Sequence, residues 1–404
     1  MNILKFPDNF WWGSATSAHQ IEGDNHNDWS EWENSPKRIE ELRSRNLDPR
    51  YFISGNACDS YNRFEEDFDI VKKLHQNIHR FSIEWSRIEP EEGRFDDKAM
   101  QHYIDVVKAL KGRGIEPMIT LWHFTNPIWF AQKGGFLNRK SPEYFSRYVK
   151  YVVGNLKDQV KFWITFNEPT TIYSAFAYLK GLWPPHKHSP VSYFVANGNF
   201  IKAHIAAYKL IKSVSHNVMV GFVENNAFVV VGHRFLKQIV GRTYNYFRNV
   251  HFIKKVSSSS DFIGLNYYNI DRKIFKNFDI LPKQTLVPSK NWEIYPKGIY
   301  ERLQEIRKFG KPIFITENGI PNVTDEERVG FIKEHLYWIW KAIQDGVDVR
   351  GYLYWSLLDN FEIVDGFRVR FGLVQIDHAT FERKIRPSAL EYAKICLTNQ
   401  LEVD

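Results

Sequence analysis

The chain has few of the features that mark secreted, membrane-spanning or redox proteins. Only two cysteines, Cys58 and Cys396, occur among its 404 residues, so neither a disulfide framework nor a cysteine-based zinc site can be built. No stretch reaches the roughly 18 uncharged apolar residues that a membrane span needs. The N-terminus has no basic start followed by an apolar stretch of signal-peptide length. These absences predict a soluble, cytoplasmic protein with no membrane partner.

The excess of positive over negative charge is also small. Lys and Arg number 54 against 47 Asp and Glu, a net charge of +7. No basic cluster interleaved with aromatic residues occurs, so we expect no nucleic-acid partner. Residues 226–311, however, hold 16 Lys and Arg against 6 Asp and Glu. This basic segment is a candidate contact surface, although a solvated face is the more ordinary interpretation, and the oligomeric state stays open.

Aromatic residues are abundant: 31 Phe, 20 Tyr and 13 Trp make up 16% of the chain. Trp and Tyr are favoured where one side of the ring is apolar and the other is wet. A sugar-binding cleft is such a place, because sugar C–H faces stack on rings while hydroxyls seek polar partners. A large ordinary core is the alternative, and composition permits both.

Short apolar runs, most of them rich in β-branched and aromatic residues, recur along the chain as expected for buried strands. The predicted strands are residues 10–19, 79–85, 115–123, 161–168, 218–225, 261–268, 312–317 and 350–358. Amphipathic helical patterns lie between most of them, at 61–74, 97–113, 142–156, 191–214, 297–308, 325–345 and 387–396. This alternation predicts a parallel sheet. Eight repeats predict a (β/α)8 TIM barrel, an α/β fold whose active site lies at the carboxyl ends of the strands.

No proline- or glycine-rich linker divides the chain, so residues 1–404 are expected to form a single domain. An open doubly wound sheet is the alternative architecture. No G-x-G-x-x-G or Walker-type loop follows the first predicted strand, which disfavours that alternative.

Two carboxylates stand out where the predicted strands end. Glu168 ends the fourth run and Glu317 ends the seventh, each beside an Asn. In a barrel these ends face one another across the mouth. Glycoside cleavage needs such a pair, one carboxyl protonated to donate to the leaving oxygen and one ionised to attack the anomeric carbon. A single Glu would more often be a surface or ion-paired residue, but two at strand ends favour chemistry.

Residues suited to sugar hydroxyls occupy other strand ends, since Asn, Gln and His both donate and accept hydrogen bonds. Asn167 could bond a hydroxyl beside the reacting carbon, and Tyr268 or Arg80 could keep Glu317 ionised. An ordinary buried ion pair for Arg80 and a satisfied core histidine for His123 are the alternatives. No metal-ligand spacing is evident, so no metal and no other cofactor is expected.

Taken in order, the motifs resemble those of the β-glycosidases of glycoside hydrolase family 1. They are the opening FPDNFWWGSATSAHQIEG, then HRFSIEWSRIEP, TFNEP, GLNYY, ITENG and YWSLLDNFE. They are jointly specific, and the resemblance extends to the C-terminal helix. It implies a barrel that hydrolyses β-linked glucosides, and often galactosides or fucosides, with retention. The partner would be a small-molecule β-glucoside or a short oligosaccharide.

The resemblance also implies a role for each matching residue. Glu168 in TFNEP resembles the general acid/base, and Glu317 in ITENG resembles the nucleophile. The other implied site residues are Gln20, His123, Asn167 and Glu362 as hydroxyl ligands, Trp355 as the stacking floor, Asn266 as a direct or supporting contact, Trp292 on the leaving-group side, and Tyr268 with Arg80 orienting Glu317. A retaining mechanism predicts carboxyl groups about 5–5.5 Å apart.

Three departures from the family pattern matter. Ile363 follows NFE where the family usually has Trp, and the missing indole N–H predicts weaker sugar affinity or an altered glucose-to-galactose preference. After His123 the family usually has Trp or Phe followed by Asp-Leu-Pro, whereas this chain has Phe124 followed by Thr125-Asn126-Pro127. The bonding inside this loop should therefore differ. The connection between the fifth and sixth runs, about 226–260, is short, and its helix is expected to be reduced.

Two further functions stay open. A 6-phospho-β-glycosidase would replace the acid at Glu362 and add a phosphate-binding cluster; Glu362 is retained here, and Arg368 and Arg370 are the only support for phosphate. A non-catalytic sugar-binding or scaffold barrel is suggested by Ile363 and the short connection. Every residue that the chemistry itself needs is nevertheless present.

Overall fold

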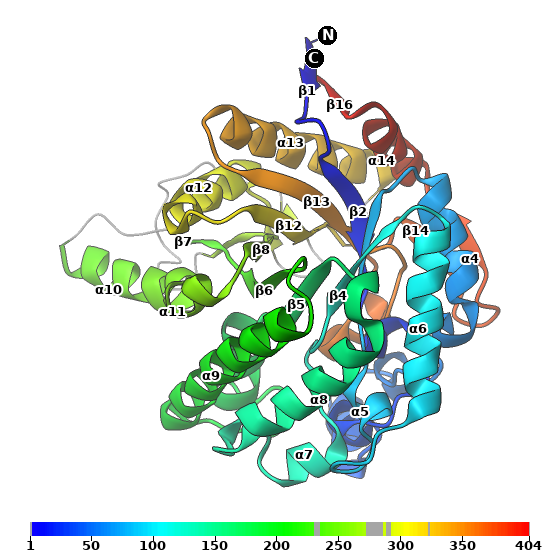
Figure 1. Cartoon of the computed structure of the whole chain (residues 1–404), viewed down its shortest axis with the longest axis vertical. Coiled ribbons are helices and arrows are strands. Elements are labelled where there is room, and N and C mark those ends of the chain that lie inside the picture. The colour runs from blue at the N-terminus through cyan, green and yellow to red at the C-terminus, as the bar shows by residue number, and fades with distance from the viewer. Residues whose placement is uncertain (1, 230–234, 272–285, 288–291, 322–323, 404) are drawn as a thin grey trace.

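Parallel strands close into a barrel in the computed structural model, which describes residues 2–229, 235–271, 286–287, 292–321 and 324–403. The order around the barrel is β12-β13-β2-β3-β4-β5-β6-β8. The strands are β2 (Trp11–Ala15), β3 (Ile78–Ser82), β4 (Glu116–Thr120), β5 (Phe162–Asn167), β6 (Met219–Asn225), β8 (Phe262–Asn266), β12 (Ile313–Asn318) and β13 (Val349–Trp355). Figure 1 shows β13 beside β2, where the barrel closes. All eight predicted strands and the (β/α)8 barrel are confirmed.

The long helices surround the barrel and begin and end close to the predicted residues. They are α4 (Ser60–Lys73), α6 (Asp97–Gly112), α8 (Ser141–Leu156), α9 (Pro190–Val214), α12 (Pro296–Ile306), α13 (Asp325–Gln344) and α14 (Pro387–Thr398). Local chemistry explains these bounds. A capping box between Thr324 and Glu327 starts α13, and Pro387 occupies the first turn of α14, where its missing N–H costs nothing.

Shorter elements cover the ends of the barrel. The helices are α1 (Ala18–Ile21), α2 (Asp28–Glu33), α3 (Pro36–Ser44), α5 (Trp85–Ile88), α7 (Ile128–Gln132) and the π-helical η4 (Pro169–Leu179). The short strands are β1 (Asn2–Lys5), β7 (Phe228–Val229), β9 (Ile270–Asp271), β10 (Leu286–Val287), β11 (Trp292–Glu293), β14 (Val374–Ile376), β15 (Arg383–Ile385) and β16 (Gln400–Val403). β1 pairs with β16, which brings the two ends of the described chain together at one edge of Figure 1.

Apolar side chains fill the interior of the barrel and exclude water from its lower part. This inner cluster consists of Ile78, Met118, Phe162, Ile164, Val223, Phe262, Phe314 and Leu353, with Trp11 and Met219 against it. Such filling by alternate strands makes a barrel a packed core rather than a pore. Arg80, in the middle of β3, is a polar residue that is fully buried as well.

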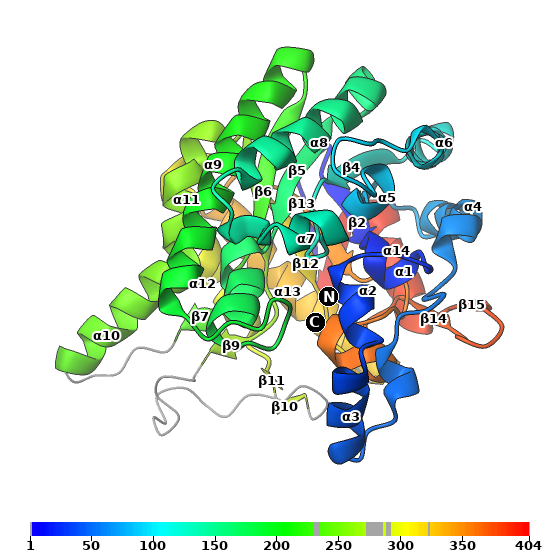
Figure 2. The same cartoon turned by 90° about the horizontal axis from the view of Figure 1, so that it is seen from below.

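The connection from β6 to β8 consists mainly of helical turns. It contains α10 (Phe235–Asn245), the π-helical η5 (Tyr246–Val250), α11 (His251–Val256) and the 3-10 helix η6 (Ser257–Ser259). Phe252 of α11 packs edge-on against Phe222 of β6, with ring centroids 5.4 Å apart. The α-helix that packs on the barrel wall, α11, has six residues and is short as expected, although Phe252 still covers β6 there. In Figures 1 and 2, α10 extends away from the barrel. Its role as a contact surface stays a prediction.

Among the described residues, no helix is both long and apolar enough to cross a bilayer. The same part of the chain holds no group of three or more His, Cys, Asp or Glu arranged to hold a metal ion.

Candidate active site

The two predicted catalytic carboxylates leave their strands at irregular points of the barrel. The β5–β6 register shifts between Ile164 and Asn167, and the β12–β8 register shifts between Ile315 and Glu317. Bulges of this kind re-aim side chains and are common beside active sites. Glu168, directly after β5, has a left-handed backbone with φ of +47°. Such strain in a residue other than glycine collects at functional sites.

Glu317 lies between two strong hydrogen-bond donors. Nη1 of Arg80 donates to its Oε1 at 2.5 Å, and the hydroxyl of Tyr268 donates to its Oε2 at 2.6 Å. Burial raises the pKa of Tyr268 well above its usual range, with the charge of Glu317 adding to the effect, so this hydroxyl stays a donor. The guanidinium charge and the short hydrogen bonds favour an ionised Glu317 carboxylate.

Glu168 has neutral donors only among its described side-chain partners. The side-chain amides of Asn266 and Asn225 donate to its Oε1 at 2.6 and 3.1 Å. Burial, and next the charge of Glu317, raises the pKa of Glu168 to about 8. The two carboxyl groups are buried alike, at 4% and 5% exposure for Glu317 and Glu168. The two carboxyl groups therefore differ in the type of their donors rather than in their burial.

Arg80 connects these carboxylates to the remaining polar residues. Its Nη2 donates to Oδ1 of Asn167 at 2.7 Å, so the Asn167 amide nitrogen must face Nε2 of His123, 3.1 Å away. Nε2 then accepts, and the proton of the ring lies on Nδ1. Burial, and next the charge of Arg80, holds the pKa of His123 well below its usual range, so the ring is neutral.

An aromatic wall closes the same end of the barrel. Trp355 at the end of β13 lies nearly parallel to His123, with ring centroids 6.0 Å apart. Its indole N–H donates to Oε1 of Glu362 at 3.2 Å. Tyr268, Trp355 and Phe371 belong to one small buried cluster. Rings, carboxylates and amides thus lie together at the carboxyl ends of the strands.

Comparison with known proteins decides the family. The model of "Glycosyl hydrolase family 1" matches residues 3–231 and 236–401. The chain belongs to glycosyl hydrolase family 1. It is 31% identical to β-glucosidase A of Thermotoga maritima, covering 100% of both chains, in an alignment of 457 positions. The family 1 chain is thus shorter than this relative, and its family match is interrupted inside the predicted short connection.

Solved structures of family 1 proteins share the fold over the whole chain. A β-glycosidase from Pyrococcus horikoshii has a TM-score of 0.89 and 37% identity, with 100% of this chain and 97% of that chain covered. The Thermotoga maritima β-glucosidase in complex with glucoimidazole has a TM-score of 0.88 and 31% identity, covering 98% of this chain and 100% of that chain. This family 1 member is therefore a glycoside hydrolase.

Gln20 of this glycoside hydrolase bonds to the protein itself. Its Oε1 accepts from the Ser17 hydroxyl at 2.6 Å, and its amide donates to Oδ1 of Asn360 and to the Phe361 carbonyl at 3.0 and 2.9 Å. Gln20 thus holds the segment immediately before Glu362. A direct contact between Gln20 and a sugar stays a prediction.

The structure shows the contacts of Ile363 and of the loop after His123, where the sequence departs from the family pattern. Ile363 is buried, belongs to the main hydrophobic cluster and has a φ of +51°, an outlying backbone conformation for a β-branched residue. In the loop after His123, Thr125 donates to Glu84 at 2.9 Å. Asn126 donates from both its backbone and side-chain nitrogens to Asp28, at 2.8 Å each. Side-chain hydrogen bonds to acidic residues outside the loop therefore hold it.

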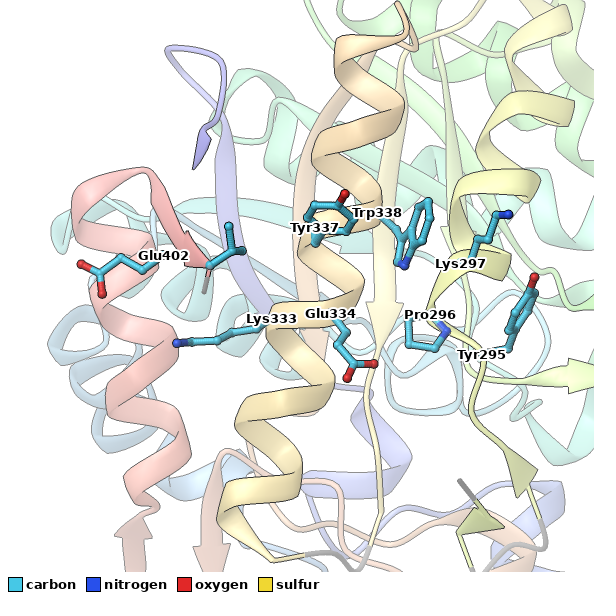
Figure 3. Close-up of a pocket in the computed structure, with 9 residues that line it drawn as sticks. Tyr295, Pro296, Lys297, Lys333, Glu334, Tyr337, Trp338 and Glu402 are labelled. Carbon is cyan, nitrogen blue, oxygen red and sulfur yellow. The ribbon is translucent and has the colours of Figure 1, made fainter. Parts of the chain in front are cut away.

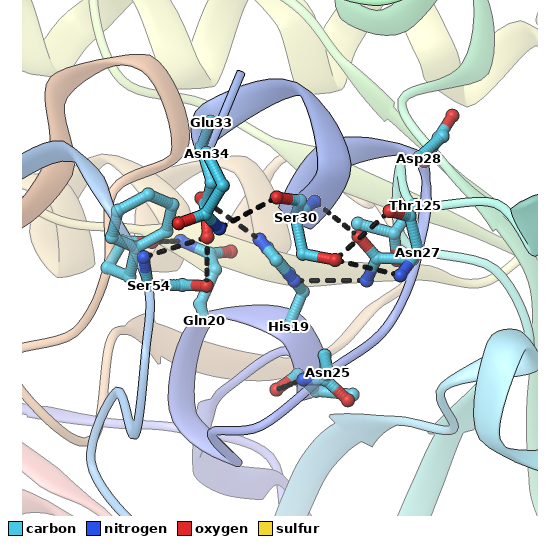
Figure 4. Close-up of polar contacts among 12 residues, drawn as sticks. His19, Gln20, Asn25, Asn27, Asp28, Ser30, Glu33, Asn34, Ser54 and Thr125 are labelled. Atoms are coloured by element: carbon cyan, nitrogen blue, oxygen red, sulfur yellow. Dashed lines mark hydrogen bonds and ion pairs between the residues drawn. The ribbon is translucent and has the colours of Figure 1, made fainter. Parts of the chain in front are cut away.

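A polar network beside this loop was not predicted from the sequence (Figure 4). His19 lies between Asn27, 3.1 Å from its Nδ1, and Glu33, 4.0 Å from its Nε2. Burial lowers the pKa of His19 to about 3 and raises the pKa of Glu33 to about 7. The His19 ring also packs edge-on against Phe361, at 5.8 Å. The network therefore supports the segment that carries Glu362.

The fifth strand end was also missed. β6 ends in Glu224 and Asn225, and Asn225 contacts Glu168 directly. Glu224 accepts hydrogen bonds from the backbone and hydroxyl groups of Thr170 and Thr171. The rule that functional residues lie at strand ends would have found both, because the predicted run 218–225 ends at Asn225.

Two other features lie apart from this site. A surface groove of about 480 Å³ lies along α12, α13 and β16, and Tyr295, Trp338, Glu334 and Glu402 are among its lining residues (Figure 3). It includes none of the predicted site residues. β11 contains Trp292, whose side chain lies outside the described part of the structure, so its predicted contact with the leaving group stays a prediction.

Proposed function

We propose that this family 1 glycoside hydrolase is a β-glycosidase, most simply a β-glucosidase, that releases terminal β-D-glucosyl residues with retention. Relatives named β-glucosidase A and β-glycosidase match its whole length, which supports the substrate class. Galactosides and fucosides are the related substrates to test. The observation that best supports the proposal is that two equally buried carboxyl groups have different partners. Glu317 is bonded to a cation and a hydroxyl, and Glu168 is bonded to amides.

The contrast supports one role for each carboxyl group. Glu317, kept ionised by Arg80 and Tyr268, attacks the anomeric carbon. Glu168, whose pKa is raised to about 8 by burial and the charge of Glu317, is protonated near neutral pH and donates its proton to the leaving oxygen. The glycosidic bond breaks as the ester bond to Glu317 forms. Pairs of carboxyl groups whose surroundings separate their charge states are typical of such catalysis.

The second half of the reaction reverses these roles. Once Glu317 is an ester it carries no charge, so it no longer raises the pKa of Glu168, and that pKa falls. Glu168, now ionised, removes a proton from a water molecule, and the resulting hydroxide attacks the anomeric carbon. The sugar leaves with its original configuration, and Glu317 is ionised again.

The remaining polar groups suit the hydroxyls of the sugar. Nδ1 of His123 is buried and makes no hydrogen bond to any other described residue, so its proton is available to a hydroxyl. Glu362 accepts hydrogen bonds, and Trp355 offers a ring face. We assign these three residues to the terminal sugar, with Asn167 beside the reacting carbon.

Replacing the nucleophile tests the proposal most directly. Glu317→Gly should lose nearly all turnover of a nitrophenyl β-glucoside and regain it with added azide, giving the α-azide as product. The wild-type enzyme should release the β-anomer first in an NMR time course. A β-azide product, or full activity of Glu317→Gly without azide, would show that the assignment is wrong.

A panel of nitrophenyl glycosides separates the other functions. Faster turnover of the glucoside 6-phosphate than of the glucoside would favour a 6-phospho-β-glycosidase. Saturable glucose binding with no turnover of any glycoside would favour a sugar-binding or scaffold barrel. The proposal requires turnover of the unphosphorylated glucoside, with the glucose, galactose and fucose rates giving the preference.

A further inference from the structure

The amide of Asn225 has a defined orientation toward the acid/base carboxyl. Its Nδ2 donates to Oε1 of Glu168 at 3.1 Å, and the amide of Asn266 donates to the same oxygen at 2.6 Å. An oxygen that accepts from two N–H groups is a poor place for a proton. The proton that Glu168 gives to the leaving oxygen therefore belongs on Oε2.

An asparagine amide can also present its oxygen, so something must fix which end faces Glu168. For Asn266 the hydroxyl of Thr316 donates to Oδ1 at 2.7 Å. For Asn225 the fixing group is Arg248, whose Nη2 donates to Oδ1 at 2.7 Å and whose Nη1 donates to the Asn225 backbone carbonyl. A guanidinium has donors only, so Oδ1 must face Arg248 and Nδ2 must face Glu168.

Arg248 comes from the basic connection that has no other assigned role. It lies in η5, the π-helical turn between α10 and α11. Its neighbour Asn249 accepts from the Ala227 nitrogen at 3.1 Å and donates to the Ala227 carbonyl at 2.9 Å. Two successive residues of η5 thus hold the chain just after β6. π-helical turns frequently occur at functional sites.

We propose that Arg248 is a positioning residue, which acts through Asn225 to hold the acid/base carboxyl of Glu168 in its donating geometry. The inference rests on the proposed function, since it assigns the acid/base role to Glu168. It also gives the basic connection a role in the reaction. Arg248 itself is half-buried and contacts the strand end rather than the sugar.

The charges around Glu168 set the direction of the expected change. Glu317, Glu224 and Tyr268 face it from β12, β6 and the segment after β8, and the charge of Arg248 acts on Glu224. The Asn225 hydrogen bond lowers the pKa of Glu168 from what burial alone would give. Without Arg248 the amide can turn and present Oδ1, which accepts a hydrogen bond from the O–H of the protonated carboxyl and favours that form.

The test compares Arg248→Met with Arg242→Met. Arg242 is exposed in α10 of the same connection, so its loss removes the same charge without the Asn225 contact. Arg248→Met should move the alkaline limb of kcat/KM upward by about one pH unit, the size of one hydrogen bond to a charged group. It should also lower kcat/KM about tenfold more for an alkyl glucoside than for dinitrophenyl glucoside, which needs little acid assistance. Arg242→Met should do neither.

A double variant separates positioning from structural support. If Arg248 acts through Asn225, then Arg248→Met combined with Asn225→Ala should match Asn225→Ala alone in pH profile and leaving-group dependence. Additive losses, or identical profiles for Arg248→Met and Arg242→Met, would overturn the inference. Arg248→Lys, which keeps the charge and one donor, should recover part of the profile if Arg248→Met folds poorly.

Glu168→Gln distinguishes this inference from the proposed function. If Glu168→Gln retains wild-type activity on the alkyl glucoside, the acid/base assignment fails, and this inference fails with it. If Glu168→Gln loses that activity while Arg248→Met behaves like Arg242→Met, only the positioning role fails.

Discussion

The two carboxylates of the site have nearly equal burial and unlike partners. Glu317 is bonded to a guanidinium and a phenol, and Glu168 to two carboxamides. Burial penalises the charged form of an acid and raises the pKa of Glu168. Glu317 has a guanidinium and a phenol beside it, whereas the described donors to Glu168 are neutral amides. This difference in donors is the basis of the proposed roles of acid and nucleophile.

The largest effect is expected when the carboxyl group of Glu168 is removed. Glu168→Ala should lower kcat for an alkyl glucoside about 10²–10⁴-fold, because general acid catalysis contributes that much. Dinitrophenyl glucoside should lose far less in the glycosylation step, since its leaving group needs no proton. Pre-steady-state kinetics with both substrates measures this difference, and equal losses would mean that Glu168 is not the acid.

The next largest effect is expected when one hydrogen-bond donor to Glu317 is removed. Tyr268→Phe should lower kcat about tenfold to hundredfold, because it removes one hydrogen bond to a charged group. The matched control is Tyr267→Phe at the neighbouring position, whose hydroxyl donates to the Tyr295 carbonyl instead. Tyr267→Phe should change the free energy of unfolding but not the rate of the folded enzyme. A rate loss shared by both variants would contradict the contrast.

The pH dependence tests the charge state of Glu168 directly. Its raised pKa of about 8 belongs to the free enzyme, and the first step needs the protonated form. kcat/KM should therefore hold up through neutral pH and fall as the pH rises through about 8. This limb should be absent in Glu168→Gln assayed with dinitrophenyl glucoside. An alkaline limb unchanged in that variant would place the titrating group elsewhere.

The smallest effect concerns Ile363, which departs from the family pattern directly after Glu362. Ile363→Trp should lower KM for nitrophenyl glucoside about three- to tenfold, the worth of one neutral hydrogen bond from an indole N–H. Ile363→Phe is the matched control, since it adds a ring without the donor. If Phe and Trp lower KM equally, packing rather than the N–H sets the affinity.

The strands and the ends of the strands could be predicted from the sequence because they depend on local patterns. A buried parallel strand is a continuous apolar run, and the residue that ends it must lie at the mouth of the barrel. Glu168 and Glu317 were found in this way, whereas Arg80 lies inside its predicted run, residues 79–85. Asn225 satisfies the same rule and was overlooked.

Other features depend on contacts that no local pattern contains. Gln20 was expected to meet a sugar, yet its hydrogen bonds hold Asn360 and Phe361, which are distant in the sequence. Arg248 belongs to a run of basic residues and differs from Arg242 only in what the π-helical turn places beside it. The short connection predicted a reduced helix, and the six-residue α11 agrees with this, but no local pattern predicted that Phe252 of α11 would cover Phe222 of β6.

The left-handed backbone of Glu168 has a consequence for how the protein could be stabilised. Glycine adopts a φ of +47° without strain, whereas glutamate does not. The carboxyl group of Glu168 is also buried close to the charge of Glu317. Glu168→Gly would relieve the strained backbone, but it would remove the proposed acid and leave the amides of Asn266 and Asn225 without this acceptor. Backbone strain and the proposed chemistry thus oppose one another at a single residue.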